Sequence, residues 1–411
     1  MIKPKIRFKG YQEEWEQRKL GDMAEFSKGS GYSKGDLIES GTPIILYGRL
    51  YTKYETIISD VDTFVEAKDG SVYSKGGEVI VPASGETTED IARAASVDKS
   101  GILLGGDLNV VMPNEDINSA FLAISISNGS LQRELARKAQ GKSVVHIHNE
   151  EIRNLIVPFP TKAEQNKMEN YFAALDHFIT LHHRKCEETK ILKKYMLQKM
   201  FPQNGSSVPE IRFWGFTEDW EQRKLGDLVD RVTRKNQDLV SELPLTISAQ
   251  YGLIDQNEFF DKRVASKDVS GYYLIENGEF AYNKSTSTDA PWGAIKRLDR
   301  YENGVLSTLY IVFGIKENNP VYSDFLVSYY STNLWHKGIH EIAAEGARNH
   351  GLLNIAPADF FETKLKIPQD IEEQKKIGKY FEELERLITL HQKKCDELQN
   401  IKKFMLQNMF I

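Results

Sequence analysis

The 411-residue sequence contains only two cysteines, Cys186 and Cys395, and its histidines and cysteines nowhere show zinc-ligand spacing. A disulfide framework or a structural metal site is therefore not expected. No apolar run approaches the roughly 20 residues that a bilayer-spanning helix needs. The basic start Met1–Arg7 is not followed by the apolar stretch of a secretory signal. These absences predict a cytoplasmic protein without membrane association.

An excess of positive charge is also missing, because 53 Lys and Arg stand against 59 Asp and Glu, for a formal net charge of -6. Net charge alone points away from DNA, although affinity for phosphates depends on where the cations cluster. The composition, with 40% hydrophobic and 27% charged residues, is that of a globular protein. The length suggests two or three domains.

Motifs of catalysis are absent as well. There is no His-Glu-x-x-His, no Gly-x-Ser-x-Gly and no convincing cluster of nuclease carboxylates. Gln140–Ser143 resembles the end of a phosphate-binding loop, but Ala136 stands where the first glycine is required. Asn319–Tyr322 lacks the second proline of the Asn-Pro-Pro-Tyr motif of adenine methyltransferases, and a turn is the better interpretation. The sequence therefore predicts no catalytic residues.

What the sequence does contain is an internal repeat. The segment 4–23 returns at 209–228 with 14 of 20 positions identical, including Trp-Glu-Gln-Arg-Lys-Leu-Gly-Asp in both copies. A second block, 164–201, returns without gaps at 373–410 with 20 of 38 positions identical. Between the blocks the two halves differ strongly, yet Gly-Glu and short apolar motifs align at a constant offset. The variable regions are therefore predicted to share a fold while presenting different side chains.

The repeat sets the predicted domains. They are a first variable domain at 1–160, a central helical spacer at 161–201, a linker at 202–208, a second variable domain at 209–368 and a C-terminal helical spacer at 369–411. Short β-prone runs alternate with Gly-rich turns in the variable regions and predict mixed α/β domains, and therefore an α+β protein. The β-prone runs are 42–46, 78–81, 110–112, 280–282 and 309–313.

The second repeated block is predicted to form long helices. Thr161-x-x-Glu164 and Asp370-x-x-Glu373 fit capping boxes at the helix starts. Apolar residues follow at alternating spacings of four and three, the pattern of a coiled-coil seam. An antiparallel pair with approximate two-fold symmetry is expected, in which Cys186 and Cys395 approach one another as small apolar side chains. His182 and His391 share a seam position, where packing is a better interpretation than metal binding.

Two variable domains, each introduced by Trp-Glu-Gln-Arg-Lys-Leu-Gly-Asp and followed by a near-identical long helix, resemble the specificity subunits of type I restriction-modification systems. The resemblance covers essentially the whole chain. It implies two target recognition domains that each read one half of a bipartite, asymmetric site in double-stranded DNA, with the helices fixing the gap. It also implies two modification subunits that bind S-adenosylmethionine and methylate adenine N6, and it allows for two motor-nuclease restriction subunits. ATP and Mg²⁺ are expected on the partners, and no cofactor on this chain.

One pair of matched polar loops supplies candidate DNA contacts. Gly141–Ser143 precedes an apolar run in the first half, and Glu345–His350 takes the corresponding place in the second. Arginine suits guanine, asparagine suits adenine, and lysine or serine suits phosphates or base edges. An ordinary solvated loop is the alternative. The candidates are Lys142, Ser143, His146, Arg348, Asn349 and His350.

A second pair of loops, Ser84–Thr88 and Lys284–Thr288, is rich in hydroxyls and follows aligned strands. Hydroxyls and cations often position a duplex through its phosphates. Surface turns are the alternative here. The candidates are Ser84, Thr87, Thr88, Lys284, Ser285, Thr286, Ser287 and the nearby Trp292, to which Tyr32, Lys34 and Arg49 are added as single residues.

Two other functions remain open at this point. A DNA-modifying enzyme would need a cofactor-binding domain, which the sequence does not show. A coiled-coil scaffold without direct DNA readout would need only the helices. The lysines near the helix ends, such as Lys190 and Lys402, fit a solvated face or a contact with phosphate or a partner.

Overall fold

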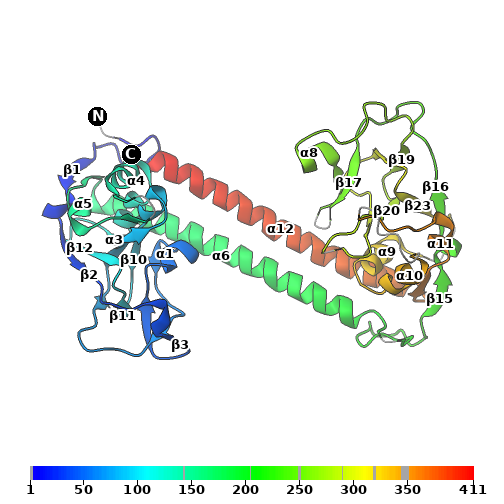
Figure 1. The fold of residues 1–411 in the computed structure, drawn as a ribbon, viewed down its shortest axis with the longest axis horizontal. Coiled ribbons are helices and arrows are strands. Elements are labelled where there is room, and N and C mark those ends of the chain that lie inside the picture. The colour runs from blue at the N-terminus through cyan, green and yellow to red at the C-terminus, as the bar shows by residue number, and fades with distance from the viewer. Residues whose placement is uncertain are drawn as a thin grey trace. The chain divides into compact units, whose positions relative to one another are not determined.

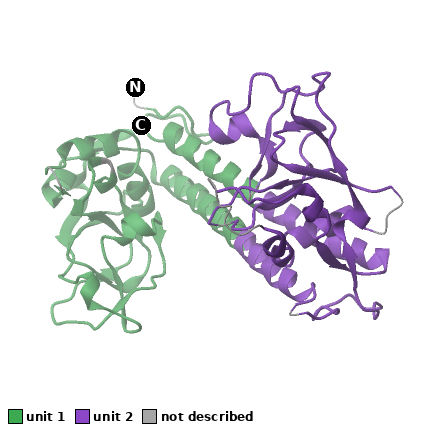
Figure 2. Cartoon of the chain, turned by 45° about the vertical axis from the view of Figure 1, so that its right-hand side comes forward, with its two compact units in different colours: residues 1–184, 392–411 green, residues 185–391 purple. Residues whose placement is uncertain are grey.

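The structure is a computed structural model, and it describes residues 3–141, 144–203, 205–248, 251–288, 290–317, 321–343 and 351–411, with the side chain of Glu89 left out. The chain forms two compact units. Unit 1 comprises residues 1–184 and 392–411, and unit 2 comprises residues 185–391 (Figure 2). Each unit therefore contains one variable region and part of each long helix.

Unit 1 is built around a five-stranded sheet with the order β2-β12-β8-β10-β5. A second sheet, β3-β6-β4-β11-β7, and the pairs β1-β14 and β13-β9 complete its β-structure. Its strands are β1 (Glu16–Lys19), β2 (Ala24–Lys28), β3 (Leu37–Ile38), β4 (Thr42–Ile45), β5 (Ile57–Ile58), β6 (Phe64–Val65), β7 (Tyr73–Lys75), β8 (Glu78–Pro82), β9 (Ser84–Gly85), β10 (Ala95–Val97), β11 (Ser100–Leu104), β12 (Leu108–Pro113), β13 (Val145–His146) and β14 (Ile156–Phe159).

Unit 1 also contains short helices, one of which, α3, packs against β8 and β10. They are α1 (Arg49–Thr52), α2 (Thr88–Ile91), α3 (Ser119–Ile126), α4 (Gly129–Lys138) and α5 (Asn149–Arg153), with 3-10 turns at Leu20–Asp22 and Lys34–Asp36. Strand β8 is buried on both faces, because Val79 and Val81 belong to the same core as α3 while Ile80 belongs to a second core. Successive side chains of a strand point to opposite faces, so a continuous apolar run fits a strand between two cores.

Unit 2 repeats this plan with a four-stranded sheet of order β16-β23-β20-β21, in which β20 takes the place of β8. Phe280 and Tyr282 of β20 face one core, and Ala281 faces the other. The strands are β15 (Glu221–Lys224), β16 (Val229–Val232), β17 (Leu245–Ser248), β18 (Gly252–Asp255), β19 (Tyr273–Glu276), β20 (Phe280–Asn283), β21 (Ala294–Arg297), β22 (Asn303–Leu306), β23 (Ile311–Ile315) and β24 (Lys364–Ile367). The short helices are α7 (Leu225–Leu228), α8 (Gln256–Phe260), α9 (Ser323–Tyr330), α10 (His336–Ile342) and α11 (Pro357–Phe361).

The predicted mixed α/β domains are confirmed, and four of the five β-prone runs coincide closely with strands. The run 309–313 is displaced, because β23 begins only at Ile311. Leu309 and Tyr310 instead belong to a turn, in which the N–H of Tyr310 donates to the carbonyl of Ser307 at 3.0 Å. The predicted domain boundaries stay a prediction, although the linker 202–208 begins just after the long helix α6 (Lys162–Lys199).

The two long helices, α6 and α12 (Ile371–Met409), pack antiparallel, as predicted (Figure 1). In unit 1, Lys402 binds Asp176 at 2.5 Å, and Cys395 Sγ lies 4.0 Å from the carbonyl oxygen of Ile179. Moving forward along α6 therefore means moving backward along α12. The contacts in unit 2 follow the same rule.

In unit 2, Lys193 forms an ion pair with Glu385, and Cys186 Sγ lies 3.8 Å from the carbonyl oxygen of Ile388. These residues hold the same places in the repeated block as the four that meet in unit 1. The predicted pseudo-two-fold pairing therefore appears in matching contacts within each unit. Both cysteines are buried, and neither takes part in a disulfide.

The starts of the long helices differ from the prediction in one respect. Both helices begin where expected, and Asp370 accepts the N–H of Glu372 at 2.8 Å. The glutamates, however, do not close capping boxes. Glu164 binds Arg7 through two hydrogen bonds of 3.0 and 2.5 Å, and Glu373 binds Arg212 through two of 2.7 Å. The reason is that the two repeated blocks meet in space, so each arginine competes for the carboxylate.

Among the described residues, no group of three or more His, Cys, Asp or Glu side chains is placed to hold a metal ion. None of the described helices combines the length and apolarity needed to cross a bilayer.

Candidate nucleic-acid interface

In unit 1, two of the predicted polar loops lie side by side. Strand β9 pairs antiparallel with β13, which places Ser84 opposite His146. The N–H of Ile147 donates to the carbonyl of Ala83 at 3.0 Å, and His146 also pairs with Gln140 in both directions. Strand pairing thus joins two segments that are about 60 residues apart in the sequence. His146 is exposed, whereas Ser84 is buried.

Unit 2 brings the equivalent segments together in the same way. The N–H of Leu353 donates to the carbonyl of Lys284 at 3.0 Å, and Ser285 bridges Leu352. Thr286 then donates to the carbonyl of Gly351 through its N–H at 2.7 Å and its hydroxyl at 3.0 Å. Lys284 is therefore the counterpart of Ala83. The carbonyl of Ala83 accepts the N–H of Ile147, and the carbonyl of Lys284 accepts the N–H of Leu353 in the same way.

Several predicted hydroxyls already have partners inside their own loop. Thr87 caps α2 by accepting the N–H of Asp90 at 3.0 Å, and Thr88 is the first residue of that helix. Ser287 accepts the N–H of Ala290 at 3.1 Å. These hydroxyls shape the loops. Thr87 also donates its hydroxyl proton to the carboxylate of Asp90 at 2.7 Å, so it has no proton left for a phosphate. Trp292 is half-buried, and its ring centroid lies 5.0 Å from that of His340. Packing explains this tryptophan.

The surroundings of Arg49 contradict the prediction that this residue contacts DNA. Its side chain is only 7% exposed and binds Asp62 and Glu55, each at 2.7 Å. The guanidinium also donates to the carbonyl of Asp60 at 3.0 Å. Hydrogen bonds from Lys53 and Arg49 lower the pKa of Asp62 to about 2, so this carboxylate remains a partner at neutral pH. Arg49 therefore holds a loop together and is not free to meet DNA.

Tyr32 and Lys34 have different surroundings. The hydroxyl of Tyr32 lies 2.5 Å from Ser71 Oγ and accepts the N–H of Lys68 at 2.8 Å. Lys34 is exposed in its 3-10 turn, at the end of which Asp36 binds Lys68. Tyr32 thus serves local packing, and only Lys34 keeps an available charge. Lys142, Ser143, Arg348, Asn349 and His350 lie outside the described residues.

Several residues near these loops were not predicted from the sequence. In unit 1, Tyr51 donates to the carbonyl of Ser84 at 2.8 Å. In unit 2, Asn283 donates to the hydroxyl of Tyr310 at 3.3 Å, while Leu309 is 55% and Tyr251 64% exposed. Their positions at the ends of strands could have identified them, because loops that follow neighbouring antiparallel strands gather at one edge of a sheet.

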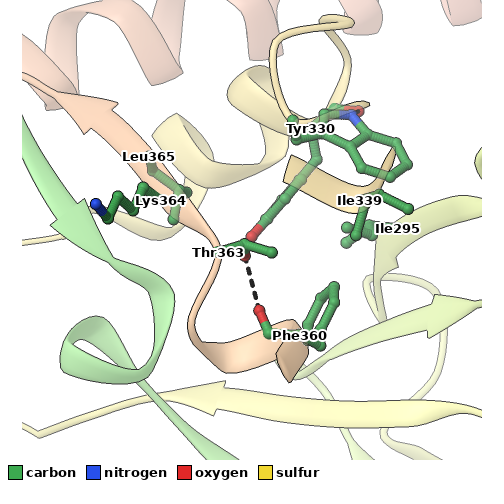
Figure 3. Close-up of a pocket in the computed structure, with 8 residues that line it drawn as sticks. Ile295, Tyr330, Ile339, Phe360, Thr363, Lys364 and Leu365 are labelled. Carbon is green, nitrogen blue, oxygen red and sulfur yellow. Dashed lines mark hydrogen bonds between the residues drawn. The ribbon is translucent and has the colours of Figure 1, made fainter. Parts of the chain in front are cut away.

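Two cavities lined by described residues are poor candidates for a competing site. One in unit 2 has a volume of about 10 Å³ and is lined mainly by core residues such as Tyr330 and Phe360, so it has room for about one water (Figure 3). A cavity of about 300 Å³ in unit 1 is lined by Arg93 and Lys402, among others. These two cations already bind Asp90 and Asp176. The larger cavity therefore has compensated charges.

A glycine supports the Lys284 loop and gives a first prediction. Gly293 has a φ of +79°, and a Cβ there would lie 2.2 Å from the carbonyl oxygen of Asn283. The G293A variant should lose about 2 to 4 kcal/mol of unfolding free energy, from backbone strain and overpacking together. Gly278 is the control, because its φ of +87° is similar but its Cβ would meet nothing within 4 Å. Urea unfolding should therefore show a smaller loss for G278A, and equal losses would contradict the steric argument.

Comparison with known proteins assigns a family to this architecture. The sequence model of the type I restriction modification DNA specificity domain matches residues 12–190 and 217–400. The chain is 23% identical over 417 residues to a putative type I restriction enzyme MjaX specificity subunit of Methanocaldococcus jannaschii, covering 95% of this chain and 91% of that protein. It is 22% identical over 223 residues to the MjaVIII specificity subunit of the same organism, and this match spans about half of each chain.

A solved structure shows the same fold. The S subunit of a type I restriction-modification system from M. genitalium superposes with a TM-score of 0.63 at 14% identity, covering 100% of this chain and 99% of that one. The family match extends over both variable regions and most of both long helices. The chain therefore belongs to the family of type I restriction-modification specificity subunits.

Proposed function

We propose that this chain reads a bipartite, asymmetric site in double-stranded DNA, one half with each unit, and performs no chemistry itself. In this proposal it directs two modification subunits, which bind S-adenosylmethionine, to methylate adenine N6. It also directs cleavage by restriction subunits that use ATP and Mg²⁺. The observation that carries the proposal is that two equivalent loop edges share a backbone arrangement but present different side chains.

This observation favours DNA readout for a physical reason. The phosphate backbone is the same at every site, whereas the base edges differ. A protein that reads two unlike half-sites therefore needs the same backbone arrangement in both domains, with a different set of side chains in each. His146 and Leu352, which take equivalent places beside Ser84 and Ser285, differ in this way. A chain with two different copies of one domain can read a site that is not a palindrome.

The test is to map methylated adenines in DNA from cells that carry this chain with its modification subunit. We expect a single two-part sequence with a fixed gap. Binding of the complex to a duplex with that sequence should weaken steeply with salt, because phosphate contacts release counterions. A scaffold without DNA readout would instead leave methylation unchanged when this chain is removed. An enzyme with its own active site would transfer methyl groups from S-adenosylmethionine without any partner, and we expect no such transfer.

A further inference from the structure

We infer that Lys284 reads the major-groove edge of a guanine in the half-site of unit 2, and is not a contact to phosphate. The inference rests on the proposed function and adds a specificity-determining residue to it. Guanine offers two acceptors side by side, O6 and N7, and a lysine ammonium is a pure donor. Three properties of Lys284 support this inference: its fixed backbone, a side chain without a polar partner among the described residues, and its counterpart in unit 1.

The backbone of Lys284 is held on both sides. Its carbonyl accepts from Leu353, and the next N–H, that of Ser285, donates to Asn283 Oδ1 at 3.0 Å. Thr286 is tied to Gly351 by two further bonds. The side chain therefore leaves from a fixed point at the end of β20, a buried strand of the sheet. Base readout requires a side chain that is held in place by its surroundings, and this backbone provides such a support.

The side chain of Lys284 is half-buried and makes neither a hydrogen bond nor an ion pair with any part of the chain that the structure describes. Its burial lowers the pKa of the ammonium. The acceptor oxygen of the adjacent Asn283 already receives the N–H of Ser285. An ammonium that has lost water and has no protein partner gains most from an acceptor that fits closely, and loses most when a base presents a donor instead.

The counterpart of Lys284 in unit 1 is Ala83, which holds the same backbone position and has no charge. A cation that binds phosphate would be useful in both units, because both meet the same backbone. A cation that is present at this backbone position in unit 2 but not in unit 1 is explained by a difference in base sequence between the two half-sites. The comparison of the two units therefore assigns Lys284 to readout.

The test uses the full chain together with its modification subunit. The methylated sequence is mapped first for the wild type and then for K284M. We expect one guanine of the second half-site to become degenerate, with discrimination reduced about 5- to 150-fold. The first half-site and the gap should not change. K284R should keep the guanine, because arginine donates to the same two acceptors. K364M, which alters an exposed lysine on β24, is the matched control and should leave the motif intact.

A second measurement does not depend on a variant. Each guanine of the second half-site is replaced in turn by 7-deazaguanine, which lacks the N7 acceptor. Wild-type binding should weaken at one position, and K284M should not respond there. An unchanged motif for K284M, or uniform weakening on all sequences with a smaller salt slope, would overturn the inference. Absence of any motif for the wild type would overturn the proposed function instead.

Discussion

Replacing Glu164 with alanine should lower the free energy of unfolding of unit 1 by about 2 to 4 kcal/mol. The carboxylate is 1% exposed and its partner Arg7 is 11% exposed. Truncation leaves the Arg7 charge largely desolvated without a counterion, and such a loss costs roughly 3 to 5 kcal/mol when burial is complete. The lower range applies because Arg7 keeps some contact with water and also donates to the carbonyl of Glu13.

The measurement is thermal or urea unfolding of the full chain. D116A is the control, since Asp116 binds Arg18 at 3.3 Å while both side chains are about half exposed. Exposed pairs contribute at most about 1 kcal/mol. E373A removes the matching pair in unit 2, in which Glu373 is also 1% exposed, and should resemble E164A. If E164A cost no more than D116A, the pair would not hold the N-terminal segment to the helix.

The internal repeat made most of the fold predictable. Because two blocks recur, one pattern could be tested twice, and the starts of both long helices followed from it. Their antiparallel pairing was predicted on a different ground, the approximate two-fold axis that relates two domains reading opposite half-sites. The pairing of Arg7 with Glu164 did not, although both residues belong to repeated blocks. A local capping pattern explained the glutamate equally well, and only the three-dimensional structure brings the arginine to it.

The candidate site was predictable only in outline. The sequence indicated which loops correspond, and the structure places Ser84 beside His146 and Ser285 beside Leu352. Arg49 was misjudged because its partners come from the loop 55–62, whose path the sequence does not reveal. Residues at strand ends, such as Tyr310, were missed because a predicted strand that begins two residues early hides the turn before it.

The largest functional effect should come from exchanging residues 24–155 for the equivalent region of another specificity subunit. One half of the methylated sequence should be replaced completely, while the other half and the gap remain. The exchange removes β2 to α5 and keeps the frame of β1 and β14, which pair from Glu16 with Phe159 to Lys19 with Ile156. The seam of α6 and α12 and the whole of unit 2 stay unchanged.

The region taken from the other subunit must pack against the parts of unit 1 that are kept. Phe121 of α3 lies 5.8 Å from Trp15 and 5.9 Å from Phe410, measured between ring centroids. Trp15 and Phe410 both lie outside the exchanged region. A donor with an aromatic residue at this position should keep the packing, whereas F121A should cost about 3 to 5 kcal/mol. Thermal unfolding of the chimera therefore separates poor packing from changed recognition. If a stable chimera changed both halves of the methylated sequence, or changed the gap, the two units would not read independently. A methylated sequence with one new half and an unchanged gap is expected if each variable region recognises its own half-site and the long helices set the gap.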